Sequence, residues 1–376
     1  MSNVILCFTV NVRNWGAEHS MCSLCDYLQQ QGQKVIVVIP RKGEIINLLN
    51  EINVEYIVHP FNFWVCDKRK FVRPDRYVRK FLSEESDIRS IVNVLKERKI
   101  TPKLIYSATI TFGTGAKLAK ILRIPHVQHI RENIDAFNYR FFFGYKFSMR
   151  YINKYSKCII CTCNAIRDRY IEDLDSDKTF AIHNGIPVVD ILPEKNYSHE
   201  LRLVQVARFM PDKRVIDTLY SIRELVNRGV ANIQLDIFGE GEEAEEYANF
   251  IKQNKLDKVI KLMGFVPHID FSPYHIGIMS STFEAFARST LDYMNNGLAV
   301  IASNSGGNLE QVLDSVTGYL YRVCDYNDMA DKIETLYNDR TRLKQMGENG
   351  RNFFLENFTQ EKYTYKVGSK ILELIH

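Results

Sequence analysis

The chain has 376 residues, of which 45% are hydrophobic and 25% are charged, and its formal net charge is +4. This length is about twice that of a typical domain, so we expect two domains, each with its own core. No run of about 18 apolar residues occurs, which excludes a membrane-spanning helix. The first residues predict a strand and carry no basic leader, so we expect a cytoplasmic protein.

The eight cysteines are scattered along the chain, which fits a reducing compartment. Cys22 and Cys25 have the spacing of half a zinc site, but they fall in a helical pattern and no second pair has matching spacing. Burial as small apolar side chains explains them better. We therefore predict no metal site and no cofactor.

Positive charge gathers in two segments, 68–80 and 139–157. The second segment has no acidic residue, and aromatic residues are interleaved with its lysines and arginines. Such a surface can lie on anionic lipid, bind RNA, or form a solvated face over a core. We favour the first and last readings, so we expect no nucleic-acid partner. Peripheral contact with the inner face of a membrane stays open.

Strand patterns alternate with helical patterns through the first half, which is typical of a parallel sheet with helices on both faces. The expected strands are 3–9, 34–39, 54–58, 103–107, 125–129, 157–162 and 178–182. The expected helices are 16–32, 43–52, 84–99, 111–123, 140–154 and 164–171. The segment 60–83 breaks this rhythm, so we expect it to be an excursion from the domain.

A turn signal, His183-Asn184-Gly185-Ile186-Pro187, closes the first series. The strands expected after it are 201–207, 232–238, 259–262, 275–279, 298–302 and 317–321. The helices expected after it are 214–229, 242–254, 286–296, 307–313, 326–338 and 341–356. We therefore expect one domain at 1–185, a second at 186–358, and a last helix within 359–376 that packs back on the first domain.

Four polar residues stand just after predicted strands, where ligands bind in open parallel sheets. Glu284 and Asp292, with seven residues between them, lie in a loop and the helix that it opens. Two carboxylates placed in this way can hold the hydroxyls of a sugar and of a ribose. Arg208 and Lys213 follow the strand 201–207, where two cations can clamp a diphosphate. An ordinary charged surface loop is the alternative for that pair.

Glycine-rich turns follow other strands, as in Gly239-Glu240-Gly241 and Gly306-Gly307. Glycine lets the backbone approach a ligand or turn tightly. Gly16 precedes the first predicted helix, whose start suits an anion. His129 ends a strand at the same edge of the first sheet, where a hydroxyl partner, an acid/base group and a structural histidine are all open readings.

In order and spacing, these motifs resemble the group-one glycosyltransferases, the large retaining family (family four) with the GT-B fold. The matching positions are Val206-Ala207-Arg208 with Lys213, Phe238-Gly239-Glu240-Gly241, Gly264-Phe265-Val266, Glu284-Ala285-Phe286-Ala287, Gly306-Gly307 with Glu310, Gly318 and Met346-Gly347. The resemblance covers nearly the whole chain and is strongest from Val204 onward. In the first half it rests on Gly16-Ala17-Glu18, His129 and a linker at Asn184-Gly185-Ile186.

The resemblance implies an α/β fold with two doubly wound Rossmann-like domains that face a cleft, and a nucleotide-diphosphate sugar as donor. It implies that Arg208 and Lys213 stabilise the leaving diphosphate without a metal and that Glu284 holds donor-sugar hydroxyls. It further implies that Asp292 contacts the ribose and that the backbone amides of Phe286 and Ala287 contact the sugar and phosphate. The backbone of Phe265 and Val266 would line the base. In the first half, Gly16 would lie at the diphosphate, and His129 would lie near the donor sugar and the acceptor.

Three departures from the family pattern bear on these roles. Asp292 stands where the family usually has glutamate, which shortens the side chain by one methylene. Ala287 stands where glycine is common, which is tolerable if only its backbone amide is used. Trp15-Gly16 replaces a double glycine and puts a large ring at the cleft.

The function implied is transfer of a sugar, with retention, to a glycan or a lipid-linked acceptor in bacterial-type surface polysaccharide synthesis. Retention by same-face attack, with the leaving phosphate taking the acceptor proton, fits better than double displacement, because the sequence shows no pair of carboxylates for the latter. Two alternatives remain open: a nucleotide-sugar epimerase of similar fold, and a non-catalytic donor-binding subunit in which Asp292 and Ala287 mark lost chemistry.

Overall fold

A computed structural model describes residues 3–10, 12, 16–69, 73–136 and 138–375 of the chain. The chain divides into two compact units. Unit 1 comprises residues 1–184 together with 360–376, and unit 2 comprises residues 185–359. The chain thus leaves unit 1 after Asn184, next to the expected boundary, and returns to it at Gln360.

Unit 1 contains a parallel sheet with the strand order β3-β2-β1-β5-β6-β8-β9. Its strands are β1 (Val4–Phe8), β2 (Lys34–Ile39), β3 (Glu55–Val58), β5 (Pro102–Ser107), β6 (His126–Ile130), β8 (Cys158–Cys161) and β9 (Thr179–Ala181). Nearly unbroken apolar runs, such as the one in β1, form these strands because both faces of the sheet are buried. The winding reverses between β1 and β5, as in doubly wound sheets.

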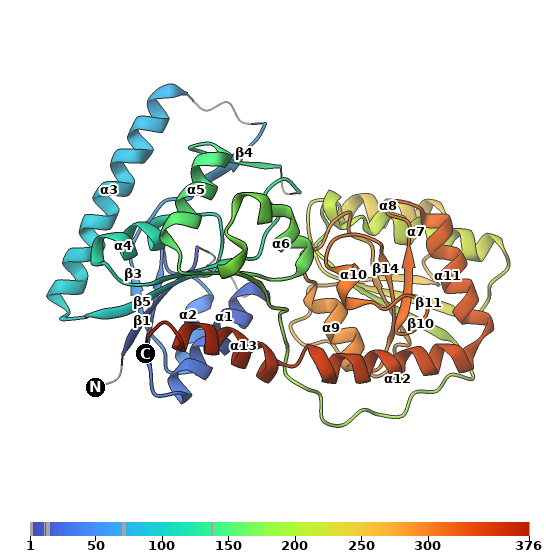
Figure 1. Cartoon of the computed structure of the whole chain (residues 1–376). Coiled ribbons are helices and arrows are strands. Elements are labelled where there is room, and N and C mark those ends of the chain that lie inside the picture. Colours follow the sequence, from blue (N-terminus) through green and yellow to red (C-terminus); the bar gives the residue numbers. More distant parts are fainter. Residues whose placement is uncertain (1–2, 11, 13–15, 70–72, 137, 376) are drawn as a thin grey trace. The chain divides into compact units, whose positions relative to one another are not determined.

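Helices cover both faces of the unit 1 sheet (Figure 1). One face packs against α1 (Gly16–Gln30), α2 (Ile45–Glu51) and α13 (Gln360–Leu372). The other packs against α3 (Pro74–Glu97) and α4 (Thr114–Leu122). Successive residues of each strand serve opposite faces. In β1, Cys7 belongs to the core under α1, and Leu6 to the core under α3.

A small antiparallel pair of strands was not expected from the sequence. β4 (Val65–Asp67) pairs with β7 (Tyr139–Phe141) across a long stretch of chain. The helix predicted at 140–154 therefore begins only at Tyr145, as α5 (Tyr145–Tyr155), and α6 (Asn164–Tyr170) follows β8. The segment 60–83 contains β4 and the start of α3, so it is partly regular structure and not only an excursion.

Trp64, just before β4, fixes this small sheet to the unit. Its indole Nε1 donates to Oε1 of the buried Glu84 in α3 at 2.8 Å, and Nζ of Lys117 in α4 donates to Oε2 at 2.9 Å. Gly113 is required beside the indole, because a Cβ there would lie 1.4 Å from a ring carbon of Trp64. A buried ion pair, together with a hydrogen bond from the indole, thus joins the start of β4 to α3 and α4.

Unit 2 is a second doubly wound sheet, with the parallel strand order β12-β11-β10-β13-β14-β15. Its strands are β10 (Leu201–Val206), β11 (Ile233–Phe238), β12 (Ile260–Gly264), β13 (Ile276–Met279), β14 (Ala299–Ser303) and β15 (Gly318–Tyr321). Its helices are α7 (Val215–Asn227), α8 (Ala244–Gln253), α9 (Arg288–Asn295), α10 (Asn308–Gln311), α11 (Tyr326–Asn338) and α12 (Arg340–Asn357).

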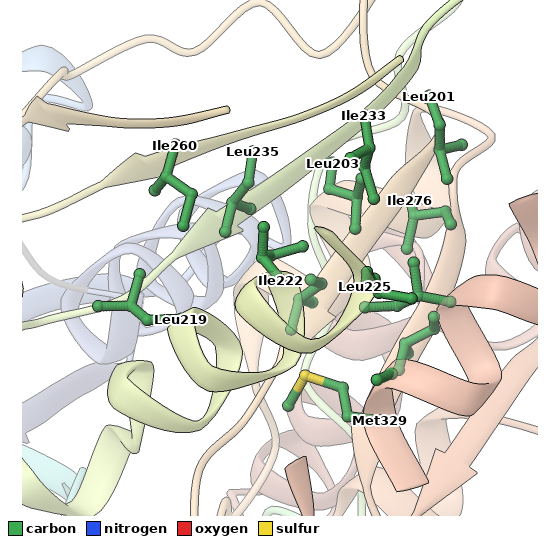
Figure 2. Close-up of a cluster of buried hydrophobic side chains, with 14 of the residues drawn as sticks. Leu201, Leu203, Leu219, Ile222, Leu225, Ile233, Leu235, Ile260, Ile276 and Met329 are labelled. Atoms are coloured by element: carbon green, nitrogen blue, oxygen red, sulfur yellow. The ribbon is translucent and has the colours of Figure 1, made fainter. Parts of the chain in front are cut away.

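The core of unit 2 lies between this sheet and helices that include α7 and α11. Figure 2 shows Leu219, Ile222 and Leu225 of α7 beside strand residues that include Leu203 and Leu235. The apolar residues of α7 recur at intervals of three, which places them on one helical face. In the part of the chain that the structure describes, no helix has the length and apolar character needed to cross a membrane.

Candidate active site

The candidate site in unit 2 lies at the carboxyl ends of β10 and β13, the neighbouring strands at which the winding reverses. Ligands of doubly wound sheets bind at such a reversal. β10 leads into the loop that carries Arg208 and into a short 3-10 turn, Pro211–Lys213. β13 leads into the loop 280–287, which carries Glu284 and ends where α9 begins.

Lys213 and Glu284 meet across these two loops. Nζ of Lys213 forms an ion pair and hydrogen bond with Oε1 of Glu284, and both side chains are largely buried. The hydroxyl of Ser281 donates to the same Oε1 at 2.8 Å. The sequence motifs assigned Lys213 to a diphosphate and Glu284 to sugar hydroxyls, and the structure brings these two residues into direct contact.

Backbone contacts hold the two loops together. The amide of Thr282 donates to the carbonyl of Asp212 at 2.9 Å, and the hydroxyl of Ser280 donates to the carbonyl of Lys213 at 2.7 Å. The position of the Lys213 side chain is therefore set by the loop that carries Glu284. Hydrogen bonds to the backbone therefore hold the two loops, and with them the ion pair, in addition to the attraction between the two charges.

Gly306 and Gly307 support the Glu284 loop from the next strand end. The amide of Gly307 donates to the carbonyl of Glu284 at 2.7 Å. A Cβ on Gly307 would lie 1.8 Å from the carbonyl oxygen of Ala285, and one on Gly306 would lie 2.2 Å from that of Glu284. These glycines are thus required by close packing of backbone on backbone, whatever else they contact.

Gly239 and Gly241 likewise pack closely against the backbone of the loop that carries Arg208. A Cβ on Gly239 would lie 1.8 Å from the carbonyl oxygen of Ala207, and one on Gly241 would lie 2.3 Å from that of Phe209. Both glycines also have positive φ angles, 142° and 156°. The side chain of Arg208 is exposed on this loop, directly after the strand that leads to Lys213.

The remaining predicted donor contacts of unit 2 differ in exposure. Phe265 follows β12 and is 68% exposed, and Val266 beside it is half-buried. Phe286 is buried, with its ring edge-on to Phe358 at 5.4 Å. Asp292 is half-buried in α9, and burial raises the pKa of its carboxyl to about 6, against the opposing effect of Arg288.

The Ala287 amide, which we predicted to contact the sugar and phosphate, has a side-chain partner within the chain. The amide already donates to Oε1 of Gln311 at 3.1 Å, and Nε2 of Gln311 donates back to the carbonyl of Ala287 at 2.7 Å. Gln311 lies in α10, and a ligand that used the Ala287 amide would have to displace its buried side-chain amide. Ala287, which stands where the family commonly has glycine, thus has both its amide and its carbonyl hydrogen-bonded to the side chain of Gln311.

In unit 1, Gly16 begins α1 at the carboxyl edge of the sheet, and its neighbour Trp15 lies outside the described residues. His129 is fully buried at the end of β6. Burial and the neighbouring Arg131 hold the pKa of its imidazole well below the usual range. The lowered pKa favours a neutral ring, which is suited to hydrogen bonding.

Among the described residues, no group of three or more histidine, cysteine or acidic side chains gathers as metal ligands would. Cys22 and Cys25 are buried in α1 as free thiols. Burial raises the pKa of the Cys22 thiol. A protonated, buried thiol is a poor metal ligand, which agrees with the apolar reading of this pair.

Comparison with known proteins extends these observations. The family described as Glycosyl transferases group 1 matches residues 192–353, and the family described as Glycosyltransferase Family 4 matches residues 16–189. A poly(ribitol-phosphate) alpha-N-acetylglucosaminyltransferase of Staphylococcus aureus (strain COL) is 27% identical over 68% of this chain. A poly(glycerol-phosphate) alpha-glucosyltransferase of Bacillus subtilis (strain 168) is 25% identical over 49% of it. The chain spans 51% and 30% of the lengths of these two relatives.

Solved structures share the fold over the full length of the chain. Anabaena Alr3699/HepE in complex with UDP superposes with a TM-score of 0.80 at 17% identity, covering 99% of this chain and 100% of the other. S. aureus TarM superposes with a TM-score of 0.75 at 15% identity, covering 100% and 99%. Two doubly wound sheets with polar loops at their carboxyl ends define a protein with the GT-B fold. Because the two family matches together span residues 16–189 and 192–353, the chain belongs to the group 1 glycosyltransferases of family 4.

Proposed function

We propose that this protein transfers a sugar from a nucleotide-diphosphate sugar to a glycan or lipid-linked acceptor, with retention of configuration, in the synthesis of a bacterial-type surface polysaccharide. The observation that carries the proposal is the Lys213–Glu284 pair at the carboxyl ends of β10 and β13. A cation and a carboxylate fixed side by side at a winding reversal match the two halves of such a donor, a diphosphate and a polyhydroxyl ring.

Each member of the pair has a distinct part in the proposal. Lys213, with Arg208, offsets the charge that develops on the diphosphate as the glycosidic bond breaks, and no metal is invoked. Both hydrogen bonds that the described residues make to the Glu284 carboxylate end on Oε1. Oε2 is therefore the atom that we assign to a hydroxyl of the donor sugar. Asp292, Phe265 and Val266 complete the proposed nucleotide contacts.

The acceptor proposal draws on relatives and on surface chemistry. The two curated relatives named above act on poly(ribitol-phosphate) and poly(glycerol-phosphate), and another relative is named for capsular polysaccharide biosynthesis. The basic segments 68–80 and 139–157 are the regions that we propose for contact with an anionic membrane, although residues 70–72 of the first lie outside the described residues. In α5, Lys146, Phe147 and Arg150 are exposed, so both charge and an aromatic ring are available there.

A donor screen followed by a transfer assay tests the proposal. A panel of uridine, guanosine and thymidine diphosphate sugars is first ranked by thermal stabilisation, since a bound ligand raises the melting temperature. The best donor is then incubated with lipid-linked and polyol-phosphate acceptors, and the new linkage is read by NMR. We expect a product with the anomeric configuration of the donor. An epimerised donor without need for an acceptor, or binding without turnover on every acceptor, would instead favour one of the two alternatives.

A further inference from the structure

Arg131 is a buried arginine, 7% exposed, whose guanidinium hydrogen-bonds only neutral groups among the described residues. Its Nη1 donates to Oδ1 of Asn184 at 2.9 Å, and its Nη2 donates to the hydroxyl of Tyr363 at 2.9 Å. The same Nη2 lies 3.3 Å from Nδ1 of His129 and 3.4 Å from the hydroxyl of Tyr106. Buried charges are normally paired with an opposite charge. The burial of a guanidinium among four neutral groups, without a carboxylate as hydrogen-bond partner among the described residues, therefore requires an explanation.

The contacts around His129 define which ring nitrogen carries the proton. Arg131 has only donors, so Nδ1 of His129 faces it as an acceptor. Nη2 has two hydrogens: one is donated to Tyr363, and the other is shared between Nδ1 of His129 and the hydroxyl of Tyr106. The Tyr106 hydroxyl lies 2.6 Å from Nδ1 and can donate to it. This arrangement favours a ring proton on Nε2. This atom is buried and has no hydrogen-bond partner among the described residues, although buried donors are almost always paired.

Arg131 also touches both places where the chain passes between the units. Asn184 is the last residue before the chain leaves unit 1, and Tyr363 lies in the first turn of α13, just after the chain returns at Gln360. The two crossings are far apart in sequence and are held by one side chain. Arg131 thus connects His129 to both of these segments, so a shift of either segment can move the His129 ring.

We infer that Arg131 is a positioning residue that fixes His129 as a neutral Nε2–H donor to a substrate oxygen and ties that ring to both chain crossings. The inference rests on the proposed function for the identity of the oxygen, which belongs to a hydroxyl or phosphate of the sugar substrates. It replaces the acid/base reading of His129 with a directed hydrogen bond. Arg131 itself need not touch the substrate.

The groups that face the ring come from several elements. Tyr106 projects from β5 and Tyr363 from α13, and the thiol of Cys7 in β1 lies near Tyr106. Glu132, next to Arg131, hydrogen-bonds the amides of Ile110 and Arg131 through Oε2. Burial raises the pKa of Tyr106 and that of Glu132. Arg131 is thus the one group that the contacts place at Nδ1 with a permanent positive charge.

Nitrogen NMR of the full-length protein labelled with ¹⁵N-histidine tests the tautomer without any activity assay. We expect one histidine, identified by its loss in His129→Gln, with its proton on Nε2 at every pH from 5.5 to 8.5. In Arg131→Met the same ring should mix tautomers and its pKa should rise, because the cation beside Nδ1 is gone while the burial that also lowers the pKa remains. A proton on Nδ1 in the unaltered protein would overturn the inference.

Kinetics test the positioning role. Residues that orient a functional histidine from behind typically cost about 10- to 100-fold in activity when removed. We expect Arg131→Met to lower kcat within this range, with the KM for the donor nearly unchanged and with a new loss of activity at low pH. Arg98→Met, which removes an exposed arginine at the end of α3, is the matched control. Equal kcat in Arg131→Met and Arg98→Met would overturn the positioning role.

A milder pair of variants keeps the test decisive if Arg131→Met fails to fold. Tyr363→Phe removes one partner of Arg131 and retains the ring, and Tyr365→Phe changes an exposed tyrosine of the same helix. We expect a fall in kcat and a shifted His129 signal only in Tyr363→Phe. If both tyrosine variants behave like the unaltered protein, the link to the returning chain is wrong. Absence of transfer in the unaltered protein would contradict the proposed function alone, since the NMR result would still stand.

Discussion

Lys213 and Glu284, 71 residues apart in the chain, form an ion pair at the carboxyl ends of β10 and β13. Each charge holds the other in a largely buried place, with Ser281 as a third partner. The nucleotide-sugar donor that we propose for this site would exchange part of this internal contact for its own phosphate and hydroxyl contacts. The fixed pair would hold both groups in place before that donor binds, which lowers the cost of ordering on binding.

Replacing Lys213 by alanine removes the cation that we propose to face the leaving diphosphate. We expect transfer to fall by about 100- to 1000-fold, the usual effect of losing one group that stabilises developing charge. The circular dichroism spectrum should be unchanged. Lys258→Ala, in an exposed turn of unit 2, is the control and should retain full activity. Full turnover in Lys213→Ala would remove the diphosphate assignment.

Gly307→Ala tests the backbone support of the Glu284 loop. The new methyl group would lie 1.8 Å from the carbonyl oxygen of Ala285, so the loop must shift. We expect a loss of about 1–3 kcal/mol in the free energy of unfolding together with a large loss of transfer. Gly350→Ala, in α12, is the control because its Cβ meets nothing closer than 3.6 Å. Chemical denaturation of both variants should separate them clearly, with Gly350→Ala as stable as the parent or slightly more so.

The raised pKa of Asp292 makes stability depend on pH in a defined direction. Its carboxyl has a pKa of about 6 in the folded chain and of about 3.9 when unfolded. Below about pH 4 it is protonated in both states and costs nothing. As the pH rises from about 4 to about 6, the unfolded chain loses this proton while the folded state keeps it, so stability falls; above pH 6 both states are ionised and the penalty stays constant.

Asp292→Asn removes this cost. We expect the variant to gain about 1–2 kcal/mol over the parent at pH 7.5, an amount reduced from two pK units because the side chain is partly exposed. The gain should almost vanish at pH 4. Thermal melts of both proteins at the two pH values measure the difference. A gain that is larger at pH 4 than at pH 7.5 would contradict the assignment.

Liposome flotation tests the proposed membrane surface. We expect binding to vesicles rich in phosphatidylglycerol that weakens as salt rises, because the attraction is electrostatic. The double variant Phe147→Ser with Arg150→Glu should bind about tenfold more weakly or worse, since each basic residue near an anionic surface contributes about 1 kcal/mol. The matched control is Leu309→Ser with Lys258→Glu, which alters exposed residues of unit 2. Equal flotation of the two double variants would argue against this surface.

The buried pair of Lys117 and Glu84 gives a stability prediction for unit 1. Lys117→Met leaves the Glu84 carboxylate buried with only the Trp64 indole as a described hydrogen-bond partner. We expect a loss of about 3–5 kcal/mol in the free energy of unfolding, and partial recovery when Glu84→Gln is added. Lys120→Met changes an exposed lysine of the same helix and should have little effect. Urea denaturation of the three variants checks the order.

The sequence was sufficient for the two sheets and for most helices, because buried parallel strands are continuous apolar runs that can be recognised one at a time. It was not sufficient for β4 and β7, which are three residues long and are defined only by pairing with each other. The predicted helix at 140–154 was wrong in its first residues for that reason. Local pattern carries no information about a partner so far away.

The same contrast between local sequence pattern and long-range contacts applies to the candidate site. Glu284, Lys213 and Arg208 could be placed from their positions after strands, because topology brings strand ends together. The hydrogen bond made by the Ala287 amide could not be predicted, since it depends on the side chain of Gln311 in another element. Arg131 was overlooked although it stands two residues from His129, because an arginine at a strand end looks like a surface charge. Its contacts with Asn184 and Tyr363 exist only in the folded unit.

Helix α13 completes unit 1 with residues that follow the whole of unit 2 in the chain. It lies so close to α1 that a Cβ on Gly368 would be 2.3 Å from a ring carbon of Tyr27. On the ribosome, residues 1–184 therefore emerge with the part of this face that α13 covers still exposed, and it stays so while unit 2 is made. The nascent first unit must wait for the last helix, so a stalled or truncated chain would expose a ready surface to chaperones and proteases.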